Sequence, residues 1–178
     1  GFFLMMQAWV QILDAGVGSG LARQASITKT NPKDFRQFIK QFSIVFALFS
    51  GVALCLLVVG WLLHDRVATD WIKSQLPEEI LSASILAMFV SLAFRYLTGP
   101  LKSGLIGLER HGALNLLLVA FSSLKFPGGL LILALYEDSL VSYFIFQAGI
   151  SFLELIVTAL VFVFYSRMVL RTKIDGDV

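Results

Sequence analysis

The sequence predicts an all-α fold, a polytopic transmembrane helix bundle, and three observations support this. Of the 178 residues, 57% are apolar and 15% are charged, against about 25% charged in a typical soluble domain. The mean hydropathy is +0.82, and a soluble domain of this size would need far more polar surface to cover its core. Five apolar runs are long enough to cross a bilayer, which takes roughly 20 helical residues, and the charged residues are concentrated between them.

The connectors between these runs are too short to fold as separate domains, so we interpret 1–178 as a single membrane domain. A β-barrel would show alternating segments of about ten residues, whereas these runs are longer and unbroken, which leaves helices. No basic n-region or cleavage site precedes the first apolar run, so it is not a signal peptide. We expect a fragment of a longer protein that continues at both ends. The predicted spans are residues 2–21, 42–63, 80–98, 113–136 and 139–166.

Each span has a distinct pattern. The first is interrupted by polar residues and runs into Gly16-x-Gly18-x-Gly20, which we expect to form a flexible, tightly packed helix end. The second has no polar stripe, so we place it against lipid or at the periphery. The third is followed by Gly99-Pro100, where we expect the helix to bend or end and to have a hinge.

The fourth span contains Pro127-Gly128-Gly129, which we expect to break the helix near mid-membrane and to act as a hinge. A static kink is the alternative. Ser103 and Gly107, between the third and fourth spans, have the small-xxx-small spacing that permits close helix contact. The fifth span carries no Gly-Pro interruption.

Basic residues alternate between the two sides of the predicted membrane. Ten lysines and arginines fall on one side and two on the other, as the positive-inside rule requires. The connectors 22–41 and 99–112 and the tail after 166 are therefore predicted to be cytoplasmic, with the first residues outside. The ten are Arg23, Lys29, Lys33, Arg36, Lys40, Lys102, Arg110, Arg167, Arg171 and Lys173.

Four ionisable residues fall inside or near the ends of the spans: Asp14, Arg95, Lys125 and Glu154. At 1.5 Å per residue, Asp14, Lys125 and Glu154 lie about 14, 18 and 20 Å from the cytoplasmic face. Each of the four belongs to a polar stripe on one helix face. One interpretation is that they form structural ion pairs that lock helices together. We favour a hydrated cavity, because intramembrane charges usually mark one.

Several chemistries are excluded or disfavoured. There is no P-loop, and the glycines at 16–20 lack the spacing of a dinucleotide loop. The single Cys55 excludes disulfides and cysteine-based metal sites, and His64 and His111 are predicted at opposite faces. Asp175-x-Asp177 matches a glycosyltransferase DxD, but it has no catalytic domain around it. The net charge of +2 makes nucleic acid an improbable partner. We therefore expect a transporter, with no enzymatic activity and no metal.

Two segments resemble a known family. Residues 7–16 end in Leu13-Asp14-Ala15-Gly16 and are followed by Arg23. A second segment contains Arg95-Tyr96-Leu97-x-Gly99, then 102–110, then Asn115. The chain resembles the N-terminal lobe of a Wzx-type O-antigen flippase, in the multidrug/oligosaccharidyl-lipid/polysaccharide exporter superfamily.

The resemblance implies that the chain is helices two to six of one six-helix lobe in a two-lobe transporter of the bacterial inner membrane. The implied substrate is an undecaprenyl-diphosphate-linked oligosaccharide, an O-antigen or capsule repeat unit, flipped to the outer leaflet by alternating access. Membrane lipids and polysaccharide polymerase or assembly proteins are the implied partners, and no cofactor is implied beyond a coupling proton or sodium ion.

By position, Arg95 and Lys125 would meet the diphosphate and Arg23 would stand at the entrance. Asp14 and Glu154 would bind a coupling cation or pair with these bases. Lys125 and Glu154 match no family motif, so their roles rest on depth and stripe alone. The alternatives are a drug/cation antiporter or peptidoglycan-precursor flippase of the same superfamily, a membrane glycosyltransferase or polymerase subunit, or a structural membrane subunit.

Overall fold

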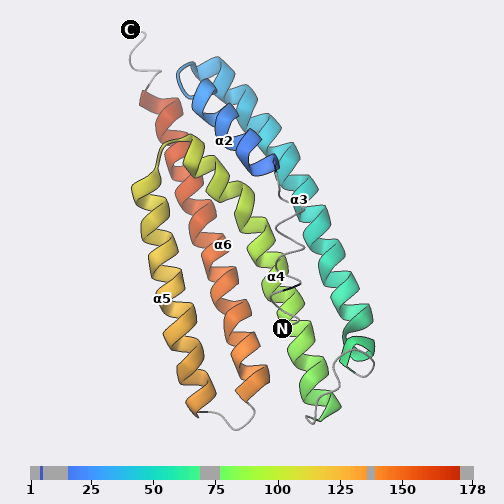
Figure 1. Cartoon of the computed structure of the whole chain (residues 1–178). Coiled ribbons are helices and arrows are strands. Elements are labelled where there is room, and N and C mark those ends of the chain that lie inside the picture. Colours follow the sequence, from blue (N-terminus) through green and yellow to red (C-terminus); the bar gives the residue numbers. More distant parts are fainter. Residues whose placement is uncertain (1–4, 6–15, 69–76, 136–138, 173–178) are drawn as a thin grey trace.

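The computed structural model describes residues 5, 16–68, 77–135 and 139–172, and in these ranges the chain is an all-α bundle, as predicted (Figure 1). Four of the five helices found in these ranges are long and apolar enough to cross a membrane. The first predicted span lies mostly outside the described residues. The helices are α2 (Val17–Thr28), α3 (Pro32–Arg66), α4 (Glu78–Gly107), α5 (His111–Leu135) and α6 (Ser139–Thr172).

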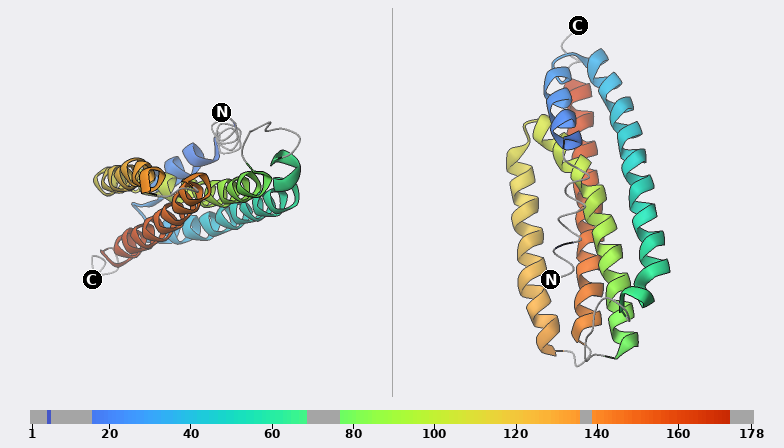
Figure 2. Two further views of the ribbon diagram at one scale, coloured as in Figure 1. Left: turned by 90° about the horizontal axis from the view of Figure 1, so that it is seen from below. Right: turned by 45° about the vertical axis from the view of Figure 1, so that its right-hand side comes forward.

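The long helices lie side by side in the order α3, α4, α6, α5, which is not their order along the chain (Figures 1 and 2). The last helix, α6, therefore sits between α4 and α5, which make few direct contacts with each other. Helix α3 forms one edge of the row, as its lack of a polar stripe predicts. The short α2 packs across α4 and α3 near one end.

The α2–α3 turn, the α4–α5 turn and the last turns of α6 gather at one end of the bundle, called here the turn end (Figure 1). Two side-chain contacts hold it together. Lys29 Nζ lies 2.6 Å from Glu109 Oε1, and the Arg110 guanidinium lies 4.7 Å from the centre of the Tyr165 ring. Glu109 is exposed, and the hydrogen bond and charge of Lys29 lower its pKa.

Helix α3 begins ten residues before the predicted span, for two local reasons. Asn31 is an N-cap whose side-chain oxygen accepts a hydrogen bond from the Lys33 backbone N–H at 3.1 Å, and Pro32 takes the first helical position. The added turns are amphipathic, so they bury one face against the bundle. The buried aromatic side chains of this face and its continuation are Phe35, Phe38, Phe42 and Phe49.

These rings connect α3 to its neighbours. Phe42 stacks on Phe162 of α6 with ring centroids 4.5 Å apart, and Phe49 stacks on Tyr96 of α4 at 4.6 Å. Aromatic pairs at these separations contribute about 0.5–1.5 kcal/mol each beyond the area they bury.

Helix α4 does not end at Gly99-Pro100, so that part of the prediction is wrong. It bends in its second half but continues to Gly107 (Figures 1 and 2). An internal proline costs about 3 kcal/mol. Beyond it, Leu101 and Leu105 are buried in the core shared with the neighbouring helices, and van der Waals packing of this kind stabilises helix contacts in a membrane. The packing of these two side chains therefore offsets the proline.

The helix ends instead after Gly107, where Glu109 has a left-handed φ of 57°. The Arg110 N–H donates to the Leu105 carbonyl at 3.0 Å and the Glu109 N–H donates to the Ile106 carbonyl at 2.9 Å. This is a Schellman motif, with glutamate where glycine is usual.

The predicted break at Pro127-Gly128-Gly129 is also wrong, because α5 is helical without interruption from His111 to Leu135. The glycines have a packing role. A Cβ on Gly128 would lie 2.6 Å from Phe146 Cζ, and one on Gly129 would lie 2.7 Å from Tyr143 Cε2. Their missing side chains let α5 approach α6 closely. Hinge motion at 127–129 and at 99–100 stays a prediction.

The other small residues divide into two groups. A Cβ on Gly107 would lie 2.3 Å from the Ala22 carbonyl oxygen, so this glycine permits the α2–α4 contact, as the small-xxx-small spacing predicts. A Cβ added at Gly16 or at Gly20 would have no atom within 4 Å. The tight packing predicted there is absent at these two positions, but Gly16 has a φ of 105° at the start of α2, which favours glycine.

Candidate functional site: a charged cluster between three helices

One carboxylate connects the three helices α4, α5 and α6. Glu154, on α6, accepts a hydrogen bond from Lys102 of α4, with Nζ 2.6 Å from Oε1. Its other oxygen, Oε2, accepts a hydrogen bond from the Lys125 ammonium of α5. Arg95 of α4 is close enough to interact electrostatically with both Glu154 and Lys125. These four residues are called the charged cluster below.

Helical periodicity brings the cluster together. Arg95 and Lys102 are seven residues apart, so both lie on the same face of α4. The opposing face of α6 carries small polar residues, and Ser91 and Ser151 hydrogen-bond across the interface with their Oγ atoms 3.3 Å apart. Small side chains allow two helices to approach closely, and this places the carboxylate of α6 within reach of α4.

Lys125 and Glu154 are deeply buried, whereas Lys102 is partly open. The side chains of Lys125 and Glu154 are each 8% exposed and that of Lys102 is 28% exposed. Gln147 Nε2 donates to the Lys125 backbone carbonyl and to the Tyr143 hydroxyl, both at 3.3 Å. Of Lys102, Lys125 and Glu154, Lys102 is thus the residue that solvent or a ligand reaches first.

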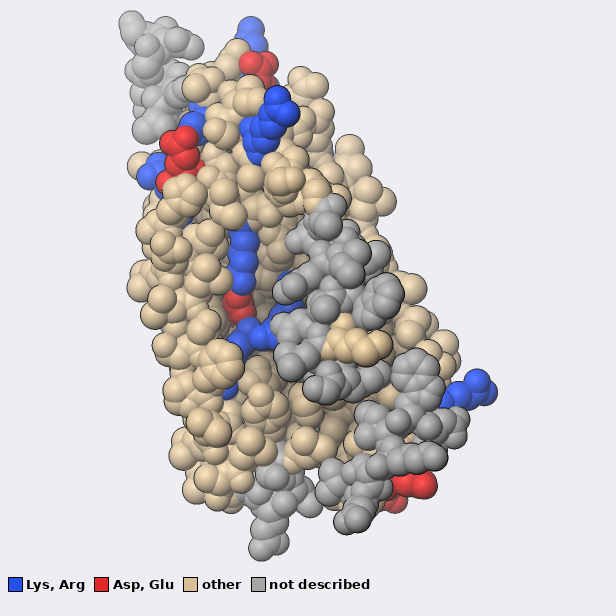
Figure 3. Space-filling model, in the orientation of Figure 1, with Lys and Arg blue, Asp and Glu red and all other residues tan. Residues whose placement is uncertain are grey.

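A cavity of about 600 Å³ lies beside the cluster, between α4, α5 and α6. Charged atoms are visible in a hollow near the middle of the face in Figure 3, away from those at the two ends. The walls combine the cluster with aromatic and aliphatic side chains. The lining residues are Arg95, Thr98, Lys102, Leu118, Phe121, Ser122, Lys125, Phe126, Tyr143, Phe144, Gln147 and Glu154.

The charge of this cavity suits an anion. Among the described residues, three bases and one acid line it, so two positive charges are in excess when these four groups are ionised. In an apolar surrounding the attraction between opposite charges is several times stronger than in water. Within the described ranges, no group of three His, Cys, Asp or Glu could hold a metal ion.

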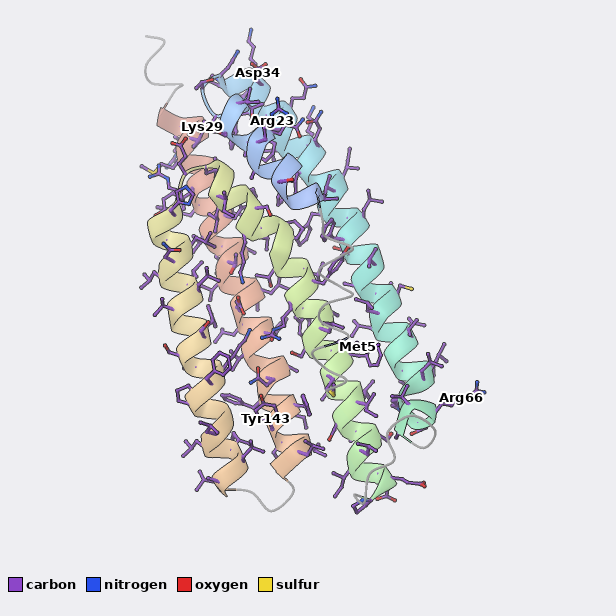
Figure 4. The ribbon with its side chains drawn as sticks, in the orientation of Figure 1. Met5, Arg23, Lys29, Asp34, Arg66 and Tyr143 are labelled. Atoms are coloured by element: carbon purple, nitrogen blue, oxygen red, sulfur yellow. The ribbon has the colours of Figure 1, made fainter. Side chains whose placement is uncertain are left out.

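The structure brings together three of the residues selected from the sequence: Arg95, Lys125 and Glu154 all line the cavity. Glu154 pairs with Lys125, one of the bases considered as its partner, and its role in binding a coupling cation stays a prediction. Arg23 is exposed on α2 at the turn end, with Lys29 and Asp34, and it does not line the cavity that contains Tyr143 (Figure 4). Asp14 lies outside the described residues.

Lys102 is the site residue that the sequence analysis did not select. It was assigned to a connector because Gly99-Pro100 suggested that the helix ended before it. Its spacing from Arg95 and Thr98 does place it on the predicted polar stripe of the third span, but it was not selected as a site residue.

Comparison with known proteins gives no further information: no protein-family model, curated protein or solved structure matches this chain.

Proposed function

We propose that this chain is part of the N-terminal lobe of a flippase that moves an undecaprenyl-diphosphate-linked oligosaccharide across the bacterial inner membrane. The observation that carries the proposal is the charged cluster, which has excess positive charge beside a cavity at mid-helix depth. Charged groups inside membrane helices are expensive and usually mark a transport path. The resemblance of residues 7–23 and 95–115 to Wzx-type flippases supplies the substrate class.

The turn end is proposed to face the cytoplasm. It carries the exposed bases Lys33, Arg36 and Lys40, which the positive-inside rule places there. Lys102 is more exposed than Lys125 and Glu154. It lies in the last two turns of α4, at this end of the bundle. An anionic headgroup arriving from the cytoplasmic leaflet would therefore meet Lys102 before Lys125.

The net positive charge of the described residues that line the cavity favours a flippase for a lipid-linked anion over a drug/cation antiporter of the same superfamily. A cation would enter a site with two positive charges in excess, and the acid there, Glu154, is already engaged by two lysines. Both facts weaken cation binding.

The test uses cells that lack the parent gene. Sealed spheroplasts are treated with a membrane-impermeant glycan-modifying enzyme, which reports the leaflet that holds the lipid-linked oligosaccharide. We expect cytoplasmic trapping in the deletion, relief by the full-length gene, and no relief by Lys125→Ala at equal membrane level. Arg36→Ala removes an exposed charge outside the cavity and is the matched control, expected to restore flipping.

Two results would contradict the proposal. Unchanged sidedness in the deletion would remove the flippase function. Restoration of flipping by Lys125→Ala would separate the charged cluster from transport.

A further inference from the structure

We infer that Glu154 is an internal competitor for the anion site: it occupies Lys102 and Lys125 in the empty protein, and a diphosphate binds by displacing it. The inference rests on the proposed function for the identity of the anion. The displacement itself rests on the geometry of the three side chains.

The two lysines are arranged around the carboxylate as they would be around a bridging anion. Each oxygen of Glu154 accepts from a different lysine, and the lysines come from different helices, α4 and α5. A diphosphate also offers several oxygens, so it can accept hydrogen bonds from both lysines at the same time. Charge-assisted hydrogen bonds of this kind are strong for carboxylate and phosphate alike.

The charges also balance after displacement. With Arg95 included, the cluster carries two positive charges in excess. A diphosphate esterified at both ends, as in a lipid-linked sugar, carries two negative charges. The loaded site is then neutral with Glu154 still ionised, and buried charge is tolerated when it is paired. Without the acid, three bases would face each other in the empty protein.

The bridge has a mechanical consequence. Helices α4 and α5 make few direct contacts, and the cavity lies between them. Glu154 thus connects α4 to α5 beside the cavity, through its hydrogen bonds to Lys102 and Lys125. A diphosphate is bulkier than a carboxylate, so its insertion between the lysines should move α5 away from α4.

The first test measures inorganic pyrophosphate binding to the full-length protein in nanodiscs by calorimetry. If Glu154 occupies the site more than about nine-tenths of the time, its removal should tighten binding at least about tenfold, because apparent affinity scales with the competent fraction. We expect this for Glu154→Gln. Glu79→Gln, an exposed acid in the first turn of α4, is the matched control and should leave affinity unchanged. Lys125→Met should weaken binding.

The second test uses the unmodified cluster and so does not depend on the folding of a Glu154 variant. Spin labels are placed at Ile106 on α4 and Leu124 on α5, both exposed and outside the cavity lining, in a background with Cys55→Ser. We expect saturating pyrophosphate to lengthen the distance between the labels.

Equal or weaker pyrophosphate binding by folded Glu154→Gln would overturn the inference, as would an unchanged label distance at saturation. If Glu154→Gln binds pyrophosphate more tightly, but deletion of the parent gene leaves the sidedness of the lipid-linked oligosaccharide unchanged, the competitor role of Glu154 is upheld and the flippase function is refuted. The two failures are therefore distinguishable.

Discussion

Replacing Gly107 with alanine tests the close contact between α4 and α2. A Cβ at this position would lie 2.3 Å from the Ala22 carbonyl oxygen and 2.5 Å from Ala25 Cβ. Neither atom is the end of a flexible side chain, so relief requires the backbones of the two helices to separate. The substitution should therefore destabilise the turn end.

The magnitude follows from two opposed effects. Alanine in place of a helical glycine gains about 0.5–1 kcal/mol of backbone entropy. Overpacking a close contact costs about 1–3 kcal/mol, and a rigid backbone neighbour places Gly107→Ala in the upper part of that range. We expect a net loss of about 1–2 kcal/mol in the free energy of unfolding. Gly112→Ala, where a Cβ meets nothing within 4 Å, is the control and should be neutral or slightly stabilising.

The assay is reversible unfolding of the purified full-length protein in mixed micelles of increasing denaturing detergent, followed by circular dichroism. Gly128→Ala gives an internal scale, because the nearest atom there is Phe146 Cζ, the far end of a half-exposed side chain that can swing away. Its loss should be smaller than that of Gly107→Ala. If Gly107→Ala proves as stable as the Gly112→Ala control, the steric argument is refuted.

Further predictions concern ion pairs and the aromatic face. Glu154→Met leaves buried lysine charge unpaired and should cost about 3–5 kcal/mol, whereas Lys125→Met leaves the acid with its second lysine and should cost less; thermal unfolding of both variants tests the order. The pKa of Glu109 is lowered in the folded protein. Its ion pair with Lys29 therefore stabilises the fold above pH 4.5, the ordinary pKa of glutamate, and this stabilisation is lost as the pH falls through the lowered pKa of Glu109. A Lys29→Ala variant should lose this pH dependence of the free energy of unfolding, measured in unfolding titrations. Phe42→Ala should cost about 3–5 kcal/mol in the same unfolding assay, because the ring is buried and stacked.

Hydropathy and length were enough to predict the fold class, because a bilayer constrains a helix to a narrow range of apolar lengths. The helix ends were harder to predict, since local signals compete with packing. Pro100 has the residue type of a helix end, yet burial of Leu101 and Leu105 carries α4 past it. Asn31-Pro32 is a helix start that hydropathy alone does not detect, because polar residues follow it.

The candidate site was partly predictable. Depth and stripe placed Lys125 and Glu154 at one level, and the structure shows them in contact. Their partner Lys102 was on the predicted stripe of the third span, but it was assigned to a connector, and only the continuation of α4 beyond Pro100 shows that it belongs to the site. The order of helices in space, which puts α6 next to α4, has no signal in a single sequence.

That order has a consequence for how the protein assembles. Synthesis proceeds from the N-terminus, so α4 and α5 enter the membrane before α6 is made. Until then Lys102 and Lys125 have no Glu154, and α4 and α5 have almost no surface in common. Helix α6 then inserts between α4 and α5. It supplies the surface on which both of them pack, and its Glu154 supplies the counter-ion of the two lysines. A chain that stops after α5 should therefore leave both lysines without their counter-ion, and we expect membrane proteases to degrade it faster than the chain that includes α6.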